Sequence, residues 1–224
     1  MILKTKQELL SEDLHNFDSL VSIMSHLRSS DGCPWDREQT HLSIRKCLIE
    51  ETYEVIEAID SEDKELMCEE LGDLIFQTVF HAQIESECNE FDINDVINGI
   101  CEKMIRRHPH VFGDTYVEDA TSVSMNWDEI KKKEYHAKKP SSEFMSAPLY
   151  LPSLIKAQKF HSKAKKVIGV GFESREDALY YAKSNPDDIV GTVFALSAVS
   201  EFDGIDLEKA LNDLINDRIS KIVK

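Results

Sequence analysis

The sequence is poor in glycine, proline and positive charge. It contains eight glycines and six prolines in 224 residues, too few for a protein built mainly from tight turns. Lys and Arg number 26 against 42 Asp and Glu, which gives a formal net charge of -16 at pH 7. A field of that sign repels nucleic-acid backbones and anionic membrane surfaces, so we expect no nucleic acid and no membrane among the partners.

Paired cysteines and long apolar runs are also missing. The five cysteines are odd in number and form no C-x-x-C pair, which argues against a disulfide framework and against a thiolate zinc site. No apolar run approaches the roughly 18 residues of a membrane helix, and the first 17 residues lack the apolar stretch of a signal peptide. We therefore expect a soluble protein of the reducing cytoplasm.

Apolar residues recur at spacings of three and four over most of the chain, and no convincing strand alternation is present. This pattern predicts an all-α fold. The expected helices span roughly 12–29, 40–60, 62–88, 93–107, 119–137, 153–165, 174–183, 186–200 and 206–222. The stretch 138–152 holds three prolines and three serines and is typical of a linker. We expect a helical domain at 1–139, a linker at 140–152 and a smaller helical repeat at 153–224.

The stretch 48–77 holds eleven carboxylates in thirty residues, and several stand beside apolar positions of two expected helices. Glu51 and Glu54 flank the stripe of the first helix, and Glu70 and Asp73 flank the stripe of the second, each pair three residues apart. If the two helices pack antiparallel through their stripes, the four carboxylates converge. Without a counter-charge, such a cluster raises the pKa values of its members.

Hard oxygen ligands in this number suit Mg²⁺, with Mn²⁺ as a substitute, and no histidine or thiolate accompanies them to favour zinc. The alternative is that these carboxylates are ordinary solvated helix flanks, because charge-rich flanks are common. Spacing alone leaves both interpretations open.

A small group of cations, Lys103, Arg106 and Arg107, interrupts the acidic background near the end of the fourth expected helix. Cations opposite a metal cluster would suit a polyphosphate, although a solvated basic helix end is the simpler interpretation. Trp35 lies in a polar loop, where it could stack on a base or anchor the loop. His81 could approach the carboxylates, but a satisfied, partly buried histidine is the safer interpretation.

Five ordered stretches resemble the MazG nucleoside triphosphate pyrophosphohydrolase family. They are DGCPWDREQTH, LIEETYEVIEAI, EELGDLIFQTVFHAQI, KMIRRHPHVFGD and WDEIKKKE, over about residues 31–134. The resemblance implies a helical bundle of the all-α NTP pyrophosphatase type, working as a homodimer or higher oligomer. It further implies Mg²⁺-dependent hydrolysis of nucleoside triphosphates between the α and β phosphates, giving NMP and pyrophosphate.

The resemblance also implies roles for individual residues. Metal ligands fall on Glu51, Glu54, Glu70 and Asp73, and Glu50 fills the preceding acidic position. Glu50 or Glu54 would act as the general base. Lys103 and Arg106, with Arg107 and Trp35 beside them, are the expected substrate-binding residues.

The second half of the chain is expected to be a degenerate repeat. Placing 187–198 under 69–80 aligns Asp188 with Glu70 and Gly191 with Asp73, so the repeat lacks the ligand pattern. A catalytically weak or inactive protein that binds a nucleotide or a partner is therefore the alternative function. A di-iron carboxylate protein is disfavoured, because the E-x-x-H elements, Glu12 to His15 and Glu38 to His41, lie outside the carboxylate cluster.

Overall fold

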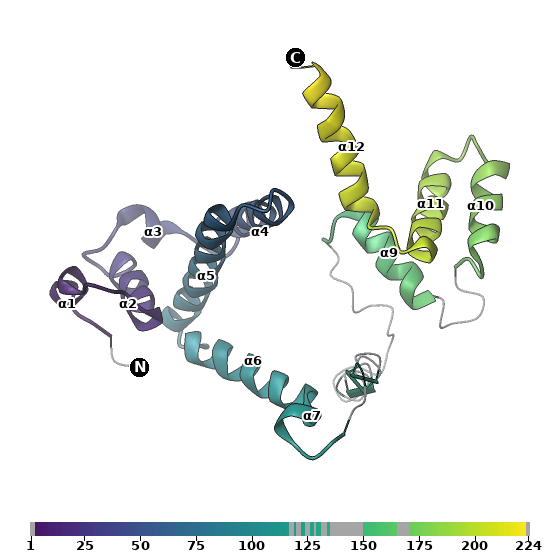
Figure 1. Cartoon of the computed structure of the whole chain (residues 1–224). Helices are drawn as coiled ribbons and strands as arrows, with labels where there is room; N and C mark the ends of the chain where they lie inside the picture. Colours follow the sequence, from purple (N-terminus) through teal and green to yellow (C-terminus); the bar gives the residue numbers. More distant parts are fainter. Residues whose placement is uncertain are drawn as a thin grey trace. The chain divides into compact units, whose positions relative to one another are not determined.

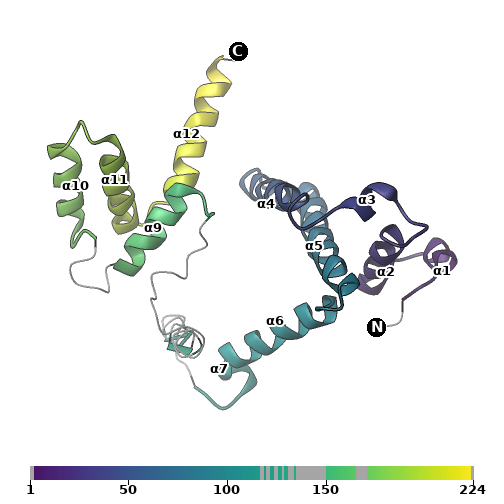
Figure 2. The ribbon, with the colours of Figure 1, turned by 180° about the vertical axis from the view of Figure 1, so that it is seen from behind.

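The computed structural model describes residues 3–116, 150–164 and 171–222, with a few isolated residues between 119 and 134. Every regular element within this described part is a helix, which confirms the all-α prediction. The chain divides into two compact units, Met1–Val117 and Glu118–Lys224. Figures 1 and 2 show the helices of each unit from opposite sides. The predicted linker at 140–152 lies outside the described residues except for its last three positions.

The long helices of the first unit lie close to where periodicity places them. They are α2 (Phe17–Leu27), α4 (Arg45–Asp60), α5 (Lys64–Glu87) and α6 (Ile93–Arg107). Three short helices were not predicted, α1 (Lys6–Ser11), α3 (Pro34–Glu38) and α7 (Pro109–Phe112). Such short helices carry too few apolar repeats to be recognised, but α3 and α7 both begin with proline, which is favoured at the first helical position. The helix expected at 119–137 lies largely outside the described residues.

Helices α4 and α5 form an antiparallel hairpin, which is the most extensive helix contact of the first unit. The turn between them is only three residues long. Glu62 adopts a left-handed backbone conformation, with φ of 55°. Asp63 then caps α5 by accepting hydrogen bonds from the backbone N–H groups of Glu65 and Leu66. This tight connection fixes which residues of the two helices face each other.

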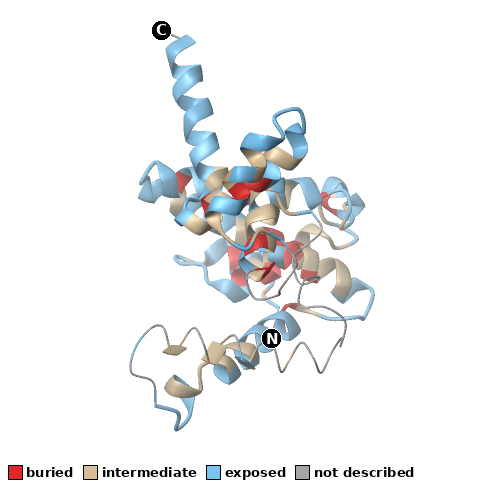
Figure 3. Cartoon of the chain, turned by 90° about the vertical axis from the view of Figure 1, so that its right-hand side faces the viewer, coloured by how far each residue is buried: buried red, intermediate tan, exposed pale blue. Residues whose placement is uncertain are grey.

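The core of the first unit lies at the C-terminal half of α5. It consists of Val21, Met24, Ile44, Val79, Phe80, Ala82 and Ile93, contributed by α2, α5, the start of α6 and the residue before α4. Buried residues, red in Figure 3, occupy short stretches of the helices. The apolar stripe expected on the N-terminal half of α5 is not buried in this chain, since Leu71 is 46% exposed and Ile75 47%. Neither α2 nor α6 covers that half of the helix.

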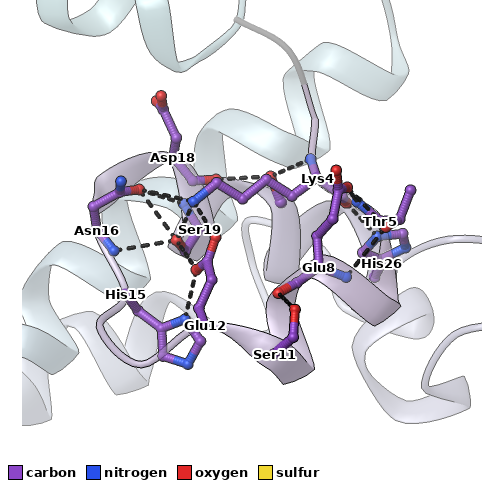
Figure 4. A network of polar contacts seen from close by, with 11 residues as sticks. Lys4, Thr5, Glu8, Ser11, Glu12, His15, Asn16, Asp18, Ser19 and His26 are labelled. Atoms are coloured by element: carbon purple, nitrogen blue, oxygen red, sulfur yellow. Dashed lines mark hydrogen bonds and ion pairs between the residues drawn. The ribbon is translucent and has the colours of Figure 1, made fainter.

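A polar network ties the N-terminal segment to α2 (Figure 4). The Lys4 ammonium lies between the Glu12 carboxylate and the Ser19 hydroxyl, and Ser19 also donates to Glu12 over 2.7 Å. His15 Nδ1 lies 2.9 Å from Glu12 Oε2, the oxygen that also accepts from Ser19. The E-x-x-H pair of Glu12 and His15 is thus part of a clamp between α1 and α2.

This clamp predicts a loss of stability in acid. Lys4 first, then Ser19 and His15, lowers the pKa of Glu12 from 4.5 to about 2. A carboxyl group with a depressed pKa stabilises the fold above its unfolded pKa, and the stabilisation is lost as the pH falls through the folded pKa. We expect the free energy of unfolding to fall between pH 4.5 and about 2, and Glu12→Gln to flatten that fall. Denaturant titrations at several pH values measure the free energy of unfolding, with Glu38→Gln, at an exposed position, as control. If this free energy fell equally steeply with pH in both variants, Glu12 would not be the group responsible.

The second unit contains α9 (Ser153–Ala164), α10 (Arg175–Ser184), α11 (Ile189–Asp203) and α12 (Leu207–Ile222), each within a few residues of its predicted range. Its core is built from small residues around one histidine. His161 is 2% exposed and bonds through Nε2 to the Phe194 carbonyl at 3.0 Å, with the Phe194 ring centroid 4.4 Å away. Helix α12 has no buried residue within this unit.

Candidate metal centre

The hairpin of α4 and α5 brings the predicted carboxylates together. One oxygen each from Glu51, Glu70 and Asp73 lies within 4.8 Å of the others. Glu70 is buried, Glu51 is half-buried and Asp73 is exposed, so the group has one side open to solvent. Glu54 stands beside them, since its side chain hydrogen-bonds to Glu51 and its charge acts on Glu70.

The negative charges of the cluster raise the pKa values of its buried members. Burial raises the pKa of Glu51, and the hydrogen bond that protonated Glu51 donates to Glu54 and the charge of Asp73 raise it further. Burial also raises the pKa of Glu70, with the charges of Glu54 and Asp73 adding to the effect. Removing these carboxylates from water without a cation is unfavourable, and a divalent cation would reverse the effect. An all-carboxylate donor set fits Mg²⁺ or Mn²⁺.

Glu50 occupies a different position from the other carboxylates of α4. It is exposed and forms an ion pair with Lys46, one turn earlier, at 2.9 Å. Adjacent residues on a helix point in different directions, which separates Glu50 from Glu51. Of the two general bases suggested by the sequence, Glu54 is the one that the fold places against the cluster.

The predicted substrate-binding residues lie on other elements. Helix α6 joins the core through Ile93 and leads away from the α4–α5 hairpin, with α7 at its far end (Figures 1 and 2). Lys103 lies ten residues after Ile93, about 15 Å along the helix axis, and Arg106 and Arg107 lie further still. Trp35 is 61% exposed on α3. Within one chain, the structure does not bring the α6 cations to the carboxylates.

Two histidines and a glutamate form a chain that the sequence did not reveal. The His41 and His81 rings stack with their centroids 5.0 Å apart, and their Nδ1 atoms are 2.7 Å apart. The other nitrogen of His41, Nε2, lies 2.6 Å from Glu85 Oε1. One turn before His81, Gln77 donates through Nε2 to Glu51 Oε1 at 3.5 Å. His81 therefore contacts His41 and not the carboxylate cluster directly, and Gln77 is the neighbour of the metal ligand.

Arg28 holds the loop before α4 against α5. Its guanidinium makes two bonds of 2.7 Å to the Glu87 carboxylate and lowers the pKa of that group. The same guanidinium donates to the backbone carbonyls of Asp36 and Gln39 and lies over the Phe80 ring. Its side chain is only 6% exposed. Because the residues of this contact are up to 59 positions apart, no local pattern could have indicated it.

The position aligned with the cluster in the second unit has a structural role. Asp188 caps α11 by accepting from the Gly191 backbone N–H at 2.9 Å, and it also accepts from the Tyr181 hydroxyl at 2.9 Å. A Cβ on Gly191 would lie 2.1 Å from Asp188 Oδ2. The capping carboxylate therefore occupies the space that a side chain corresponding to Asp73 would need.

Carboxylates from two antiparallel helices meet in one open cluster on an all-α scaffold. The chain is therefore a helical protein suited to bind a divalent metal. The part of the chain that the structure describes has no helix with the length and apolar character needed to cross a membrane. Residues 39–112 match the MazG nucleotide pyrophosphohydrolase domain. This match includes all four predicted ligands.

The chain is similar to three curated relatives, two of which are named nucleoside triphosphate pyrophosphohydrolases. The chain is 51% identical over 145 residues to the uncharacterized protein YabN of Bacillus subtilis, covering 65% of this chain and 29% of YabN. It is 47% identical over 167 residues to the nucleoside triphosphate pyrophosphohydrolase/pyrophosphatase MazG of Thermotoga maritima, covering 75% of this chain and 62% of that relative. It is 44% identical over 161 residues to the nucleoside triphosphate pyrophosphohydrolase of Escherichia coli, covering 71% of this chain and 60% of that relative. The chain spans less than two thirds of the length of each of these relatives. On the domain match and the named relatives, the chain belongs to the MazG family.

Proposed function

We propose that this protein hydrolyses nucleoside triphosphates between the α and β phosphates, releasing NMP and pyrophosphate, with Mg²⁺ as the metal and Mn²⁺ as a substitute. The observation that carries the proposal is the convergence of Glu51, Glu70 and Asp73 within 4.8 Å. Relatives named nucleoside triphosphate pyrophosphohydrolase support the reaction.

In this proposal Glu51, Glu54, Glu70 and Asp73 would hold the metal. A bound divalent cation supplies positive charge for the phosphate oxygens and lowers the pKa of a coordinated water. Glu54, beside Glu51 and Glu70, would accept the proton of the attacking water as general base. Glu50, bound to Lys46, would be the second candidate for that role.

The cations of α6 would bind the phosphates, and Trp35 would stack on the base. The distance between α6 and the cluster within one chain supports an oligomeric enzyme, in which a second copy supplies these residues. Exposed apolar side chains on the hairpin, among them Ile49, Tyr53, Ile56 and Ile75, support the same proposal of a homodimer or higher oligomer. Mixing Glu70→Gln with Arg106→Ala subunits tests it, since the wild-type KM should reappear only if one site uses residues of both chains.

Arg106→Ala should raise KM for the nucleotide about tenfold or more while leaving Mn²⁺ affinity near that of the wild type. A guanidinium that binds phosphate contributes to the ligand and not to the metal, so the loss falls on substrate binding. Steady-state kinetics and metal titration separate the two effects. An unchanged KM would assign Arg106 to a surface role.

Release of pyrophosphate tests the proposal itself. A panel of canonical and modified nucleoside triphosphates is assayed with Mg²⁺, and again after the metal is chelated. Metal-dependent pyrophosphate release is expected, and the preferred base would separate a role in removing damaged nucleotides from control of nucleotide levels. Hydrolysis without metal would overturn the proposed metal role. Tight nucleotide binding without turnover would favour the binding protein, an alternative that the Asp188 cap in the second unit also favours.

We further propose that the protein acts in the cytoplasm, in line with its free cysteines.

A further inference from the structure

Among the described helices of the second unit, α12 alone has no buried residue. Its start is held by Gln158 of α9, whose amide donates to the Ile205 carbonyl at 2.6 Å and accepts from the Leu207 backbone N–H at 3.1 Å. Every residue from 209 to 222 is exposed, and this stretch extends beyond α9, α10 and α11 (Figures 1 and 2). Because isolated helices shorter than about 15 residues are only marginally stable in water, a covering surface would stabilise this stretch.

The uncovered part of α12 carries an apolar stripe. Five large aliphatic side chains, between 43% and 82% exposed, form it, namely Leu211, Leu214, Ile215, Ile219 and Ile222. At 100° per residue these positions fall within one half of the helix circumference. The ion pairs of Lys209 with Asp213 and of Asp217 with Lys221 lie outside it. This amphipathic pattern is typical of a helix whose apolar face packs against a partner.

A regular seam runs along this face. Its positions alternate at intervals of three and four residues, the repeat of helices that pair along one line, and they are Glu208, Leu211, Ile215, Arg218 and Ile222. One carboxylate oxygen of Glu208, Oε2, is shielded from solvent and has no hydrogen-bond partner among the described residues. Arg218 has no ion pair within that part of the chain either. The α12 seam thus holds an unpaired carboxylate near its start and an unpaired guanidinium near its end.

We propose that α12 pairs along this seam with α12 of a second copy of the chain, in antiparallel orientation. A twofold axis at the level of residue 213 places Glu208 of each copy opposite Arg218 of the other, and Leu211 opposite Ile215. Two charge pairs then enclose two aliphatic layers, and the guanidinium supplies the donor that Glu208 lacks. A parallel pair would place Glu208 on Glu208 and Arg218 on Arg218, which is unfavourable because like charges repel. Charge complementarity therefore selects the antiparallel pair.

The face complements itself, which makes a second copy the partner that fits it. The whole chain carries a formal net charge of -16, so two copies repel each other on average. The α12 seam carries one charge of each sign and is neutral, which allows two copies to meet along it. This contact lies in the second unit and uses no metal ligand. It adds an interface to the oligomer proposed from the α4–α5 hairpin, and it does not depend on the proposed hydrolysis.

Cross-linking of the full chain tests the contact directly. Protein labelled with ¹⁴N and with ¹⁵N is mixed until native mass spectrometry shows exchanged oligomers, and a short lysine-specific reagent is added. We expect mixed-isotope links between Lys209 and Lys221, about 6 Å apart along the axis of the antiparallel pair, and none between two copies of Lys221, about 24 Å apart. Links between like lysines would indicate a parallel pair and overturn the proposal. A monomeric chain, or links only to Lys46 and Lys64 of the same copy, would also overturn it.

Exchanging the two charges tests the register. Glu208→Arg or Arg218→Glu alone makes both charge pairs repulsive and should raise the dissociation constant about tenfold in sedimentation experiments over a dilution series. The double variant restores opposite charges and should return to within about threefold of the wild type. Glu173→Arg and Lys183→Glu make the same charge changes at exposed positions outside α12 and should leave association unchanged. Single variants that associate like the wild type, or a double variant without recovery, would refute the pairing of residues 208 and 218.

Discussion

Replacing Glu70 by Gln should lower Mg²⁺-dependent pyrophosphate release by at least about 100-fold. Outer partners of metal ligands already contribute about 10- to 100-fold, and Glu70 is the buried member of the cluster itself. Its carboxylate provides charge that a neutral amide cannot replace. Pyrophosphate assays at saturating Mg²⁺ measure the effect, and isothermal titration with Mn²⁺ should show the same loss of binding.

The control is Glu69→Gln, which removes one charge from the adjacent exposed position. It should retain nearly full activity, because its side chain does not point into the cluster. Without metal, Glu70→Gln should raise the melting temperature, since burial and the charges of Glu54 and Asp73 make the ionised Glu70 unfavourable. Full activity in Glu70→Gln would place the metal elsewhere.

Arg28→Ala should destabilise the first unit by about 3 kcal/mol, because hydrogen bonds to charged groups contribute about 1.5 to 3 kcal/mol and several are lost together. The substitution removes the guanidinium donor from the Asp36 and Gln39 carbonyls and from the Glu87 carboxylate, which keeps only its bond from Gln83. Denaturant unfolding measures the loss.

Arg28→Lys separates charge from geometry. An ammonium keeps the positive charge but cannot make the paired contact with Glu87 and also reach both carbonyls, so it should recover only part of the stability. Restoration of wild-type stability by lysine would mean that charge alone matters at this position.

The helices and the carboxylate cluster could be predicted because both follow from local spacing. Periodicity located α4 and α5 to within a few residues, and two pairs of carboxylates at a spacing of three need only an antiparallel hairpin to meet. The short turn at 61–63 makes that hairpin unavoidable. Sequence reasoning could therefore place Glu51, Glu70 and Asp73 together.

Contacts between distant parts of the chain could not be predicted in this way. The pairing of His41 with His81 joins residues 40 positions apart, and Arg28 reaches Glu87 across 59. Leu71 and Ile75 belong to the apolar stripe of α5 and are exposed, because periodicity indicates only that a face is apolar and not what covers it. Likewise, the sequence of α6 shows its cations but not the direction in which the helix leaves the core.

The short connection between α4 and α5 limits which insertions and deletions the site can tolerate. One residue inserted into or deleted from α5 between the turn and Glu70 would rotate the rest of that helix by about 100° relative to the turn and shift it by about 1.5 Å. Glu70 and Asp73 would then face away from Glu51, although every ligand would still be present in the sequence. Substitutions that respect the left-handed conformation of Glu62, such as Glu62→Gly, are compatible with the site. Insertions and deletions in α5 before Glu70 should therefore be rejected by selection far more strictly than changes of residue type.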